Sequence, residues 1–203
     1  MNTTKIKIVV SDLAGTVVDF GSCAPAAAFV ELFAREGIAV TEEQCRTPMG
    51  RNNRDHIIAV TVMPGVIEQC AAKYGGVPCP AVIDRLYNAF VPLQIEVLAR
   101  YTEAIEGASS AFDILKSRGI KVAFTTGYNR EMTSIVLNAL ERQGMVPDCS
   151  FCAEDVPAGR PAPWMIFRSM EALGVYPPSS VLNVGDTLAD IQSGLNAGAV
   201  SVG

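Results

Sequence analysis

The sequence predicts an α/β fold, a doubly wound parallel sheet of the Rossmann-like kind with an all-helical domain inserted after its first strand. Three observations support this fold class. A short apolar run near the N-terminus is typical of a buried parallel strand, residues 24–99 carry almost only helical periodicity, and the remainder alternates helical and strand patterns. No internal repeat or low-complexity segment interrupts this order.

The first strand is expected at residues 5–10, directly before Asp12. The first helical segment after it places four apolar side chains on one side, namely those of Ala27, Phe29, Val30 and Phe33. Three more buried strands are expected at residues 120–125, 150–153 and 181–184. The pattern predicts amphipathic helices between them, over residues 108–117, 130–143 and 164–173.

Glycines follow each of the three later helices, at Gly119, Gly144 and Gly174, where a left-handed cap is expected. We therefore assign residues 1–20 and 100–203 to a Rossmann-like core and residues 21–99 to a helical cap domain. Another strand begins just before the last residue, so we expect the chain to be a shortened form of a longer protein.

The composition argues against several classes of protein. The net charge is -5 and no cluster of Lys and Arg occurs, so nucleic acid is a poor candidate partner. No apolar run reaches about 18 residues and no signal segment precedes the first strand, which predicts a cytoplasmic protein without a membrane partner. The six cysteines are dispersed and are expected to be reduced thiols.

Four short motifs follow apolar runs, and the carboxyl ends of parallel strands are where such sheets bind ligands. Asp12 is the candidate nucleophile, because a carboxylate at a strand end can attack phosphorus and form an aspartyl phosphate. The hydroxyl of Thr126 can donate to phosphoryl oxygens. Arg160, in a loop rich in Pro and Gly, can neutralise both phosphoryl and carboxylate charge. Asp186 offers an oxygen ligand to Mg²⁺.

Taken alone, each motif is explained as well by a structural role as by the chemical role given above. The Asp12 motif could be a turn before a helix, a lone arginine is more often solvated than catalytic, and the segment after Asp186 could be a loop with a helix N-cap. Their order along the chain and their shared position after strands favour a common site.

With these motifs, the chain resembles the haloacid dehalogenase superfamily and, more closely, the phosphonoacetaldehyde hydrolases, or phosphonatases. The longer matching strings are Asp12-Leu-Ala-Gly-Thr16, Pro48-Met-Gly50, Thr125-Thr-Gly-Tyr-Asn-Arg-Glu-Met132, Asp155-Val-Pro-Ala-Gly-Arg-Pro161 and Gly185-Asp-Thr187. The resemblance covers essentially the whole sequence. It implies Mg²⁺-dependent cleavage of a C–P bond to acetaldehyde and phosphate, and a homodimer formed through the cap.

The resemblance also implies roles for individual residues. Mg²⁺ would be bound by Asp12, by Asp186 and by the backbone carbonyl of Ala14. Ala14 replaces the acid that superfamily phosphatases use to protonate a departing alkoxide. A departing carbon has no ester oxygen that needs this proton, so Ala14 favours a phosphonate substrate. The structural alternative is that Ala14 is a small packing residue in an ordinary phosphatase.

The cap supplies the remaining substrate contacts in the family. The substrate pocket is expected to include Met49, Gly50, Asn53 and His56 of the cap and Tyr128 of the core; His56 and Tyr128 could instead have only packing roles. The family's Schiff-base lysine corresponds to Asn53, which cannot form an imine. Three interpretations stay open: a phosphonatase with altered chemistry, a hydrolase of another small phosphorylated compound, and an impaired relative that binds but turns over poorly.

Overall fold

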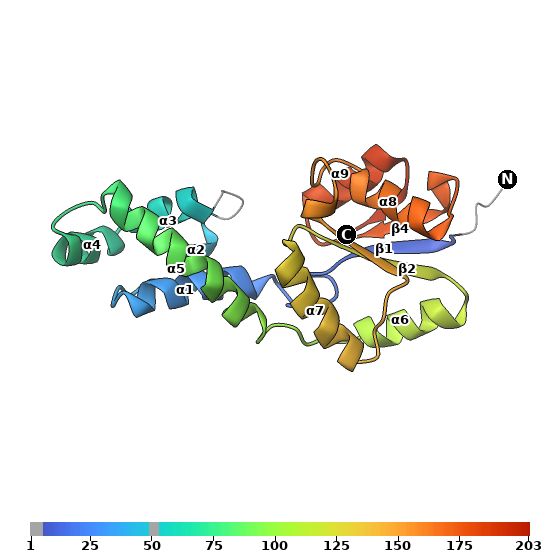
Figure 1. Cartoon of the computed structure of the whole chain (residues 1–203), viewed down its shortest axis with the longest axis horizontal. Coiled ribbons are helices and arrows are strands. Elements are labelled where there is room, and N and C mark those ends of the chain that lie inside the picture. The colour runs from blue at the N-terminus through green and yellow to red at the C-terminus, as the bar shows by residue number, and fades with distance from the viewer. Residues whose placement is uncertain (1–5, 49–52) are drawn as a thin grey trace. The chain divides into compact units, whose positions relative to one another are not determined.

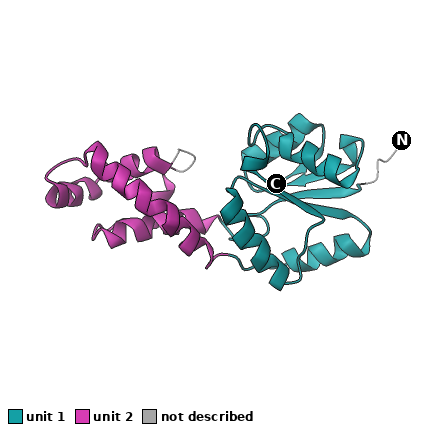
Figure 2. Ribbon diagram, viewed as in Figure 1, with its two compact units in different colours: residues 1–21, 102–203 teal, residues 22–101 magenta. Residues whose placement is uncertain are grey.

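The computed structural model describes residues 6–48 and 53–203. The chain divides into two compact units, one of residues 1–21 and 102–203 and one of residues 22–101 (Figure 2). We call them the core unit and the helical unit. Among the described residues, none of the helices is both long enough and apolar enough to cross a membrane.

The core unit contains a five-stranded, all-parallel sheet in the order β3-β2-β1-β4-β5 (Figure 1). The strands are β1 (Ile8–Asp12), β2 (Lys121–Thr126), β3 (Cys149–Cys152), β4 (Val181–Val184) and β5 (Val200–Val202). The helices are α6 (Ala108–Ser117), α7 (Arg130–Arg142), α8 (Trp164–Leu173) and α9 (Leu188–Ala197), with short 3-10 turns η1 (Ala153–Asp155) and η2 (Pro178–Ser180). This arrangement confirms the predicted α/β fold class.

Helices cover both faces of the sheet, with α8 and α9 on one face and α6 and α7 on the other (Figure 1). A buried apolar cluster joins β1 and β2 to α8 and includes Ile8, Val10, Ala123 and Ile166. Because side chains alternate along a strand, the positions on this face of β1 lead directly to Asp12 at the strand end.

Two expectations need correction. The first strand runs from Ile8 to Asp12 instead of over residues 5–10, because backbone pairing with β2 continues past the last apolar residue, Val10. The expected buried strand at 150–153 is β3, an edge strand in which only Cys152 is buried. An edge strand has one neighbour, so its side chains are less covered than those of a central strand.

The helical unit contains α1 (Cys23–Arg35), α2 (Glu42–Arg46), α3 (Asn53–Thr61), α4 (Val66–Tyr74) and α5 (Pro80–Leu98). It has its own apolar core, in which Phe29 and Phe33 of α1 pack with Leu86 and Phe90 of α5. Thr41 begins α2 with a reciprocal capping box to Gln44.

Candidate active site

The carboxyl ends of three neighbouring strands bring the core motifs to one edge of the sheet. Asp12 ends β1 and lies beside Thr125 of β2 in the parallel register, and Asp186 follows the end of β4. Asp12 is only 5% exposed. Asp12 and Asp186 come to one edge because the carboxyl ends of parallel strands all lie on the same side of a sheet.

Arg160 contacts Asp12, Thr125 and Asp190 through its three guanidinium nitrogens. One terminal nitrogen donates to Oδ1 of Asp12 at 2.6 Å, and the other donates to Oγ1 of Thr125 at 2.8 Å. Its Nε contacts Oδ1 of Asp190 at 2.8 Å. The side chain of Arg160 is 15% exposed, so these contacts are largely shielded from water. A planar guanidinium with all three nitrogens engaged has a fixed orientation.

Burial raises the pKa of Asp12 to about 6. The guanidinium of Arg160 opposes this shift, and the nearby carboxylate of Asp190 adds to it. Desolvation disfavours the charged form of a carboxyl group, and in this pocket it outweighs one close cation. A further positive charge beside Asp12 would favour its nucleophilic carboxylate form.

Three carboxylates, that of Asp12 among them, could hold a cation at this point. Ligand oxygens of Asp12, Asp186 and Asp190 all lie within 4.8 Å of one another. Thr16 donates to Oδ1 of Asp186 at 3.4 Å. Hard carboxylate oxygens are the donors that Mg²⁺ prefers, so this set of residues fits the cation.

The backbone allows Asp186 to approach the nucleophile loop closely. Gly15 has a φ of +90°, and a Cβ built there would lie 2.2 Å from Oδ2 of Asp186. A Cβ at Gly185 would similarly lie 2.4 Å from Cβ of Asp190. Both glycines therefore leave space that the carboxylates occupy.

Asp190 and Thr125 are the contacts that the sequence interpretation missed. In the sequence, Asp190 stands out only as part of the string after Gly185. Its spacing from Thr187 is that of a capping box, and Thr187 and Asp190 do cap α9 reciprocally. This signal could have located Asp190 on the first turn of α9, but its contact with Arg160 depends on tertiary structure.

Thr126 and Tyr128 lie on the turn after β2. The hydroxyl of Thr126 accepts a hydrogen bond from the backbone N–H of Tyr128 at 3.2 Å. Burial raises the pKa of Tyr128, and the carboxylates of Asp19 and Asp12 raise it further. Within the described part of the chain, the Tyr128 hydroxyl has no hydrogen-bond partner. It therefore stays a neutral phenol near the site carboxylates.

The predicted residues of the helical unit are described by their local contacts. Asn53, the first residue of α3, is half-buried and donates from Nδ2 to Oε1 of Gln94 at 3.4 Å. His56 is 1% exposed and stacks on Phe29 with ring centroids 3.7 Å apart. These contacts give His56 a packing role, and its place in a substrate pocket stays a prediction. Met49 and Gly50 lie outside the described residues.

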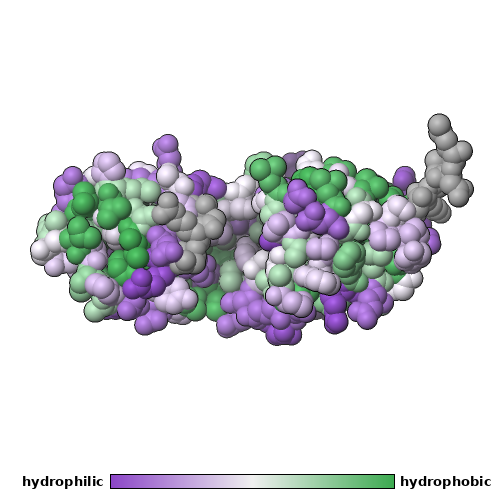
Figure 3. Space-filling model, turned by 90° about the horizontal axis from the view of Figure 1, so that it is seen from above, coloured by the Kyte–Doolittle hydropathy of each residue, from purple (hydrophilic) through white to green (hydrophobic). Residues whose placement is uncertain are grey.

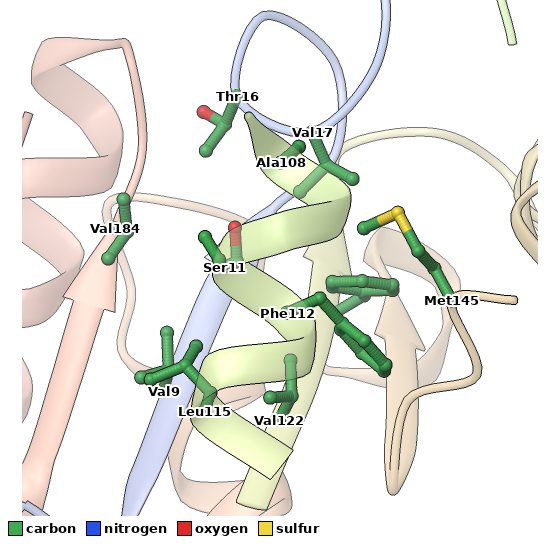
Figure 4. Close-up of a pocket in the computed structure, with 12 residues that line it drawn as sticks. Val9, Ser11, Thr16, Val17, Ala108, Phe112, Leu115, Val122, Met145 and Val184 are labelled. Atoms are coloured by element: carbon green, nitrogen blue, oxygen red, sulfur yellow. The ribbon is translucent and has the colours of Figure 1, made fainter. Parts of the chain in front are cut away.

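An apolar cavity of about 180 Å³ lies between α6 and the sheet (Figure 4). Phe112 and Leu115 of α6 line it with Val9 and Val122 of the sheet. Asp12, Arg160 and Asp186 are not among its lining residues. It lies on the opposite face of β1 from the apolar residues that lead to Asp12, and it adjoins the candidate active site at Thr16, which also donates to Asp186.

Known proteins are similar to this chain in both sequence and fold. A family model of haloacid dehalogenase-like hydrolases matches residues 6–198. A phosphonoacetaldehyde hydrolase from Bacillus cereus is 41% identical over 199 residues, which cover 98% of this chain and 75% of that protein. This chain belongs to the phosphonoacetaldehyde hydrolase family of haloacid dehalogenase-like hydrolases.

Solved structures of the superfamily agree. A phosphonoacetaldehyde hydrolase-like protein from Oleispira antarctica is 37% identical, with a TM-score of 0.78, over 98% of this chain and 72% of that one. A haloacid dehalogenase family hydrolase from Deinococcus radiodurans, solved with phosphate and sodium, has a TM-score of 0.71 over 98% of this chain and 80% of its own. That protein is 20% identical and shows the common fold alone.

Asn53 stands where the family resemblance implies a Schiff-base lysine, and the described lysines have other surroundings. Lys7 and Lys121 lie at the amino ends of β1 and β2, the edge opposite Asp12. Lys116 pairs with Asp148 at 2.9 Å, and Lys73 of the helical unit pairs with Glu36 at 3.0 Å. Among the described residues, then, each lysine is either at the far edge of the sheet or in an ion pair.

Proposed function

We propose that this chain is a Mg²⁺-dependent hydrolase that cleaves a small phosphonate through an aspartyl phosphate on Asp12. Asp12 attacks phosphorus, the P–C bond breaks with its electron pair on carbon, and that carbon takes up a proton from water. A second water then hydrolyses the acyl phosphate, which releases inorganic phosphate and restores Asp12. The observation that carries the proposal is the contact of Arg160 with Asp12 at 2.6 Å, at the edge where Asp186 and Asp190 lie.

Each residue has a distinct task in this reaction. Arg160 offsets the charge of the phosphoryl group and of Asp12 together. Thr126 accepts from a backbone N–H, which leaves its own hydrogen to donate to a phosphoryl oxygen. Asp12, Asp186 and the carbonyl of Ala14 would hold Mg²⁺, with Asp190 close by. The bound cation would stabilise developing charge on the phosphoryl oxygens.

Ala14 favours a carbon leaving group, because a methyl side chain cannot protonate a departing alkoxide. A general acid contributes roughly 10²–10⁴-fold to reactions that need one. An ordinary phosphomonoesterase without it would therefore be slow. We propose phosphonoacetaldehyde as the substrate class on this basis and because a relative with that name is 41% identical.

Asn53 supports a second candidate, a hydrolase of another small phosphorylated compound. The amide of Asn53 cannot form an imine with an aldehyde, and an enolate stabilised only by hydrogen bonds is a poor leaving group. Arg54 is paired with Asp84 at 2.8 Å, and its guanidinium is not a useful imine-forming amine. Turnover of phosphonoacetaldehyde by the native chain is accordingly expected to be slow.

A substrate panel monitored by release of inorganic phosphate separates the two candidates. Phosphonoacetaldehyde and small phosphomonoesters are given to the native chain, to Asn53→Lys and to Asn53→Met, which matches lysine in length but has no amine. We expect phosphonoacetaldehyde to be preferred and Asn53→Lys to raise its turnover by about tenfold or more, since covalent catalysis is restored. Asn53→Met should give no rise.

Three results would change this assignment. A preference of the native chain for phosphomonoesters would refute the interpretation of Ala14. Fast native turnover of phosphonoacetaldehyde, with borohydride trapping an imine on another lysine, would refute the interpretation of Asn53. A chain that is stabilised by beryllofluoride and Mg²⁺ but releases no phosphate from any compound would be a binding relative.

The helical unit is proposed to be the cap that covers the substrate and excludes water during the reaction. The homodimer formed through this unit and the cytoplasmic location stay predictions. Light scattering on the purified chain tests the first, and fractionation of cells that express it tests the second.

A further inference from the structure

The loop of residues 156–163 carries Arg160 between η1 and α8 and has no regular secondary structure. One internal turn is present, in which the backbone N–H of Ala162 donates to the carbonyl of Gly159 at 3.1 Å. An irregular loop needs outside contacts if it is to hold a guanidinium at three partners.

Helix α9 supplies these contacts from side chains spaced three residues apart. Nε of Arg160 is held by Asp190 at 2.8 Å. The hydroxyl of Ser193 donates to the carbonyl of Ala162 at 3.0 Å, and Nδ2 of Asn196 donates to the carbonyl of Pro161 at 2.9 Å. Residues at this spacing share one face of a helix. We call Asp190, Ser193 and Asn196 the α9 stripe.

The stripe is itself held in place. Nδ2 of Asn183, on β4, donates to the backbone carbonyl of Asp190 at 3.0 Å and ties the first turn of α9 to the sheet. Gln192 donates to Oδ1 of Asn196 at 2.9 Å, which fixes the amide with its Nδ2 toward Pro161. Ser193 is 3% exposed, so its hydrogen bond is protected from water.

We infer that Ser193 and Asn196 are positioning residues that hold the loop so that Arg160 meets Asp12 and Thr125 together. The inference rests on the proposed function for its effect on turnover, but not for its effect on Arg160 itself. Ser193 and Asn196 contact two consecutive carbonyls directly after Arg160, whereas Asp190 contacts the guanidinium. Loss of the two carbonyl contacts lets the loop shift, and a shift of even about 1 Å spoils three hydrogen bonds at once.

The kinetic test compares Ser193→Ala and Asn196→Ala with Asn138→Ala, a matched change at an exposed position of α7. We expect each stripe variant to lower kcat by about fivefold to twentyfold, the loss given by one or two hydrogen-bond energies, with little change in KM. Ser193→Thr keeps the hydroxyl and should recover much of the loss. Asn138→Ala should leave kcat unchanged.

A double-mutant cycle shows whether the loss acts through Arg160. In an Arg160→Ala background, the same stripe changes should reduce the residual activity less than about twofold, because there is no guanidinium left to position. Equal losses in both backgrounds would overturn the inference. Asn196 is exposed, so Asn196→Ala is expected to fold even if Ser193→Ala does not.

A second readout needs no turnover. The Nε–H resonance of Arg160 in a nitrogen-15 spectrum is assigned by its loss in Arg160→Lys. It should be sharp in the native chain and broadened in Asn196→Ala, whereas Asn138→Ala leaves it sharp. If the native chain hydrolyses nothing and this resonance still broadens, the proposed function fails and the positioning role stands. An unchanged resonance in both stripe variants would refute the positioning role.

Discussion

Gly15 has a role at the candidate site through the absence of a side chain. The carboxylate of Asp186 occupies the volume that a Cβ at Gly15 would fill, and Thr16 donates to that same carboxylate. The position also has a φ of +90°, which residues with a side chain rarely adopt. A side chain at this position would therefore strain the backbone and would also displace a candidate metal ligand.

We expect Gly15→Ala to abolish stabilisation of the chain by Mg²⁺, because the new methyl group forces Asp186 away. The strain of the left-handed backbone adds roughly 1–2 kcal/mol of destabilisation. The measurement is the rise in melting temperature on addition of Mg²⁺.

Gly119→Ala is the control for this change. Gly119 has a φ of +70°, and a methyl group added there would meet nothing within 4 Å, so the substitution carries the strain without the clash. It should lower the melting temperature and keep the response to Mg²⁺. If Gly15→Ala also kept that response, Asp186 would not be a ligand of the cation.

At the scale of elements, the sequence predicted the bounds of helices best where a local signal, such as a glycine, ends the helix. The expected bounds 108–117 and 164–173 coincide with α6 and α8. Gly119 and Gly174 both have the positive φ expected after these helices. Such ends are set by backbone conformation within a few residues and are therefore visible in the sequence.

Partners far apart in the chain were harder to predict. The sequence indicated Arg160 and Asp12 as members of one site, but it did not show that Asp190 and Thr125 complete the contacts of Arg160. Two adjacent threonines follow the same apolar run, and strand register decides that Thr125 faces Arg160. Register and loop path depend on tertiary packing, so a linear pattern cannot supply them.

Glu36, directly after α1, joins three parts of the helical unit. Its carboxylate accepts from Arg85 of α5 at 2.5 Å and from the hydroxyl of Tyr74 at 2.9 Å, and it pairs with Lys73 of α4 at 3.0 Å. The hydrogen bond from Arg85 is the main cause that lowers the pKa of Glu36 to about 2, against the opposing effect of burial.

This pKa predicts a pH-dependent contribution to stability. A carboxyl group whose pKa is lower in the folded state stabilises the fold above its unfolded pKa, and the stabilisation is lost as the pH falls through 4.5 toward about 2. Glu36→Gln should therefore reduce the free energy of unfolding by about 1–3 kcal/mol at neutral pH. The deficit should shrink steadily below pH 4.5, as followed by urea titrations at each pH.

Glu96→Gln provides the comparison. Glu96 also pairs with an arginine, Arg35, at 3.0 Å, but its side chain is 59% exposed. Exposed ion pairs contribute little, so this change should alter stability by less than about 0.5 kcal/mol. A pH-independent deficit in Glu36→Gln would show that the ion pairs are not its cause.

At the scale of the whole molecule, each of the two units has a buried apolar cluster of its own among the described residues. One lies beneath α8 in the core unit and the other is formed by the helices of residues 22–101. The outer surface mixes residue types: hydrophobic and hydrophilic residues are interspersed over the visible face of each unit (Figure 3). Each unit thus has the buried apolar cluster and the mixed surface of an independently folded domain.

Calorimetry should therefore resolve two unfolding transitions. Mg²⁺ should raise the midpoint temperature of the transition that belongs to the core unit. A ligand that binds only the folded form stabilises it by mass action, by about 2.7 kcal/mol when its concentration is a hundred times Kd. Asp186→Asn should remove this rise, and Glu36→Gln should lower only the midpoint temperature of the helical unit's transition. One transition that both changes move equally would contradict the assignment of separate cores.

The path of the chain between the units has a consequence for how such proteins can diversify. Within the core unit, Val18 pairs with Ala104 in antiparallel fashion, and the N–H of Ile105 donates to the carbonyl of Val17 at 2.8 Å. The points where the chain leaves and rejoins the core are therefore neighbours. A short linker could close this gap, so the residues between them behave as an exchangeable module. Replacing that module would leave Asp12 and Arg160 in place and, under the proposed role of the helical unit as a cap, would change which compounds are accepted.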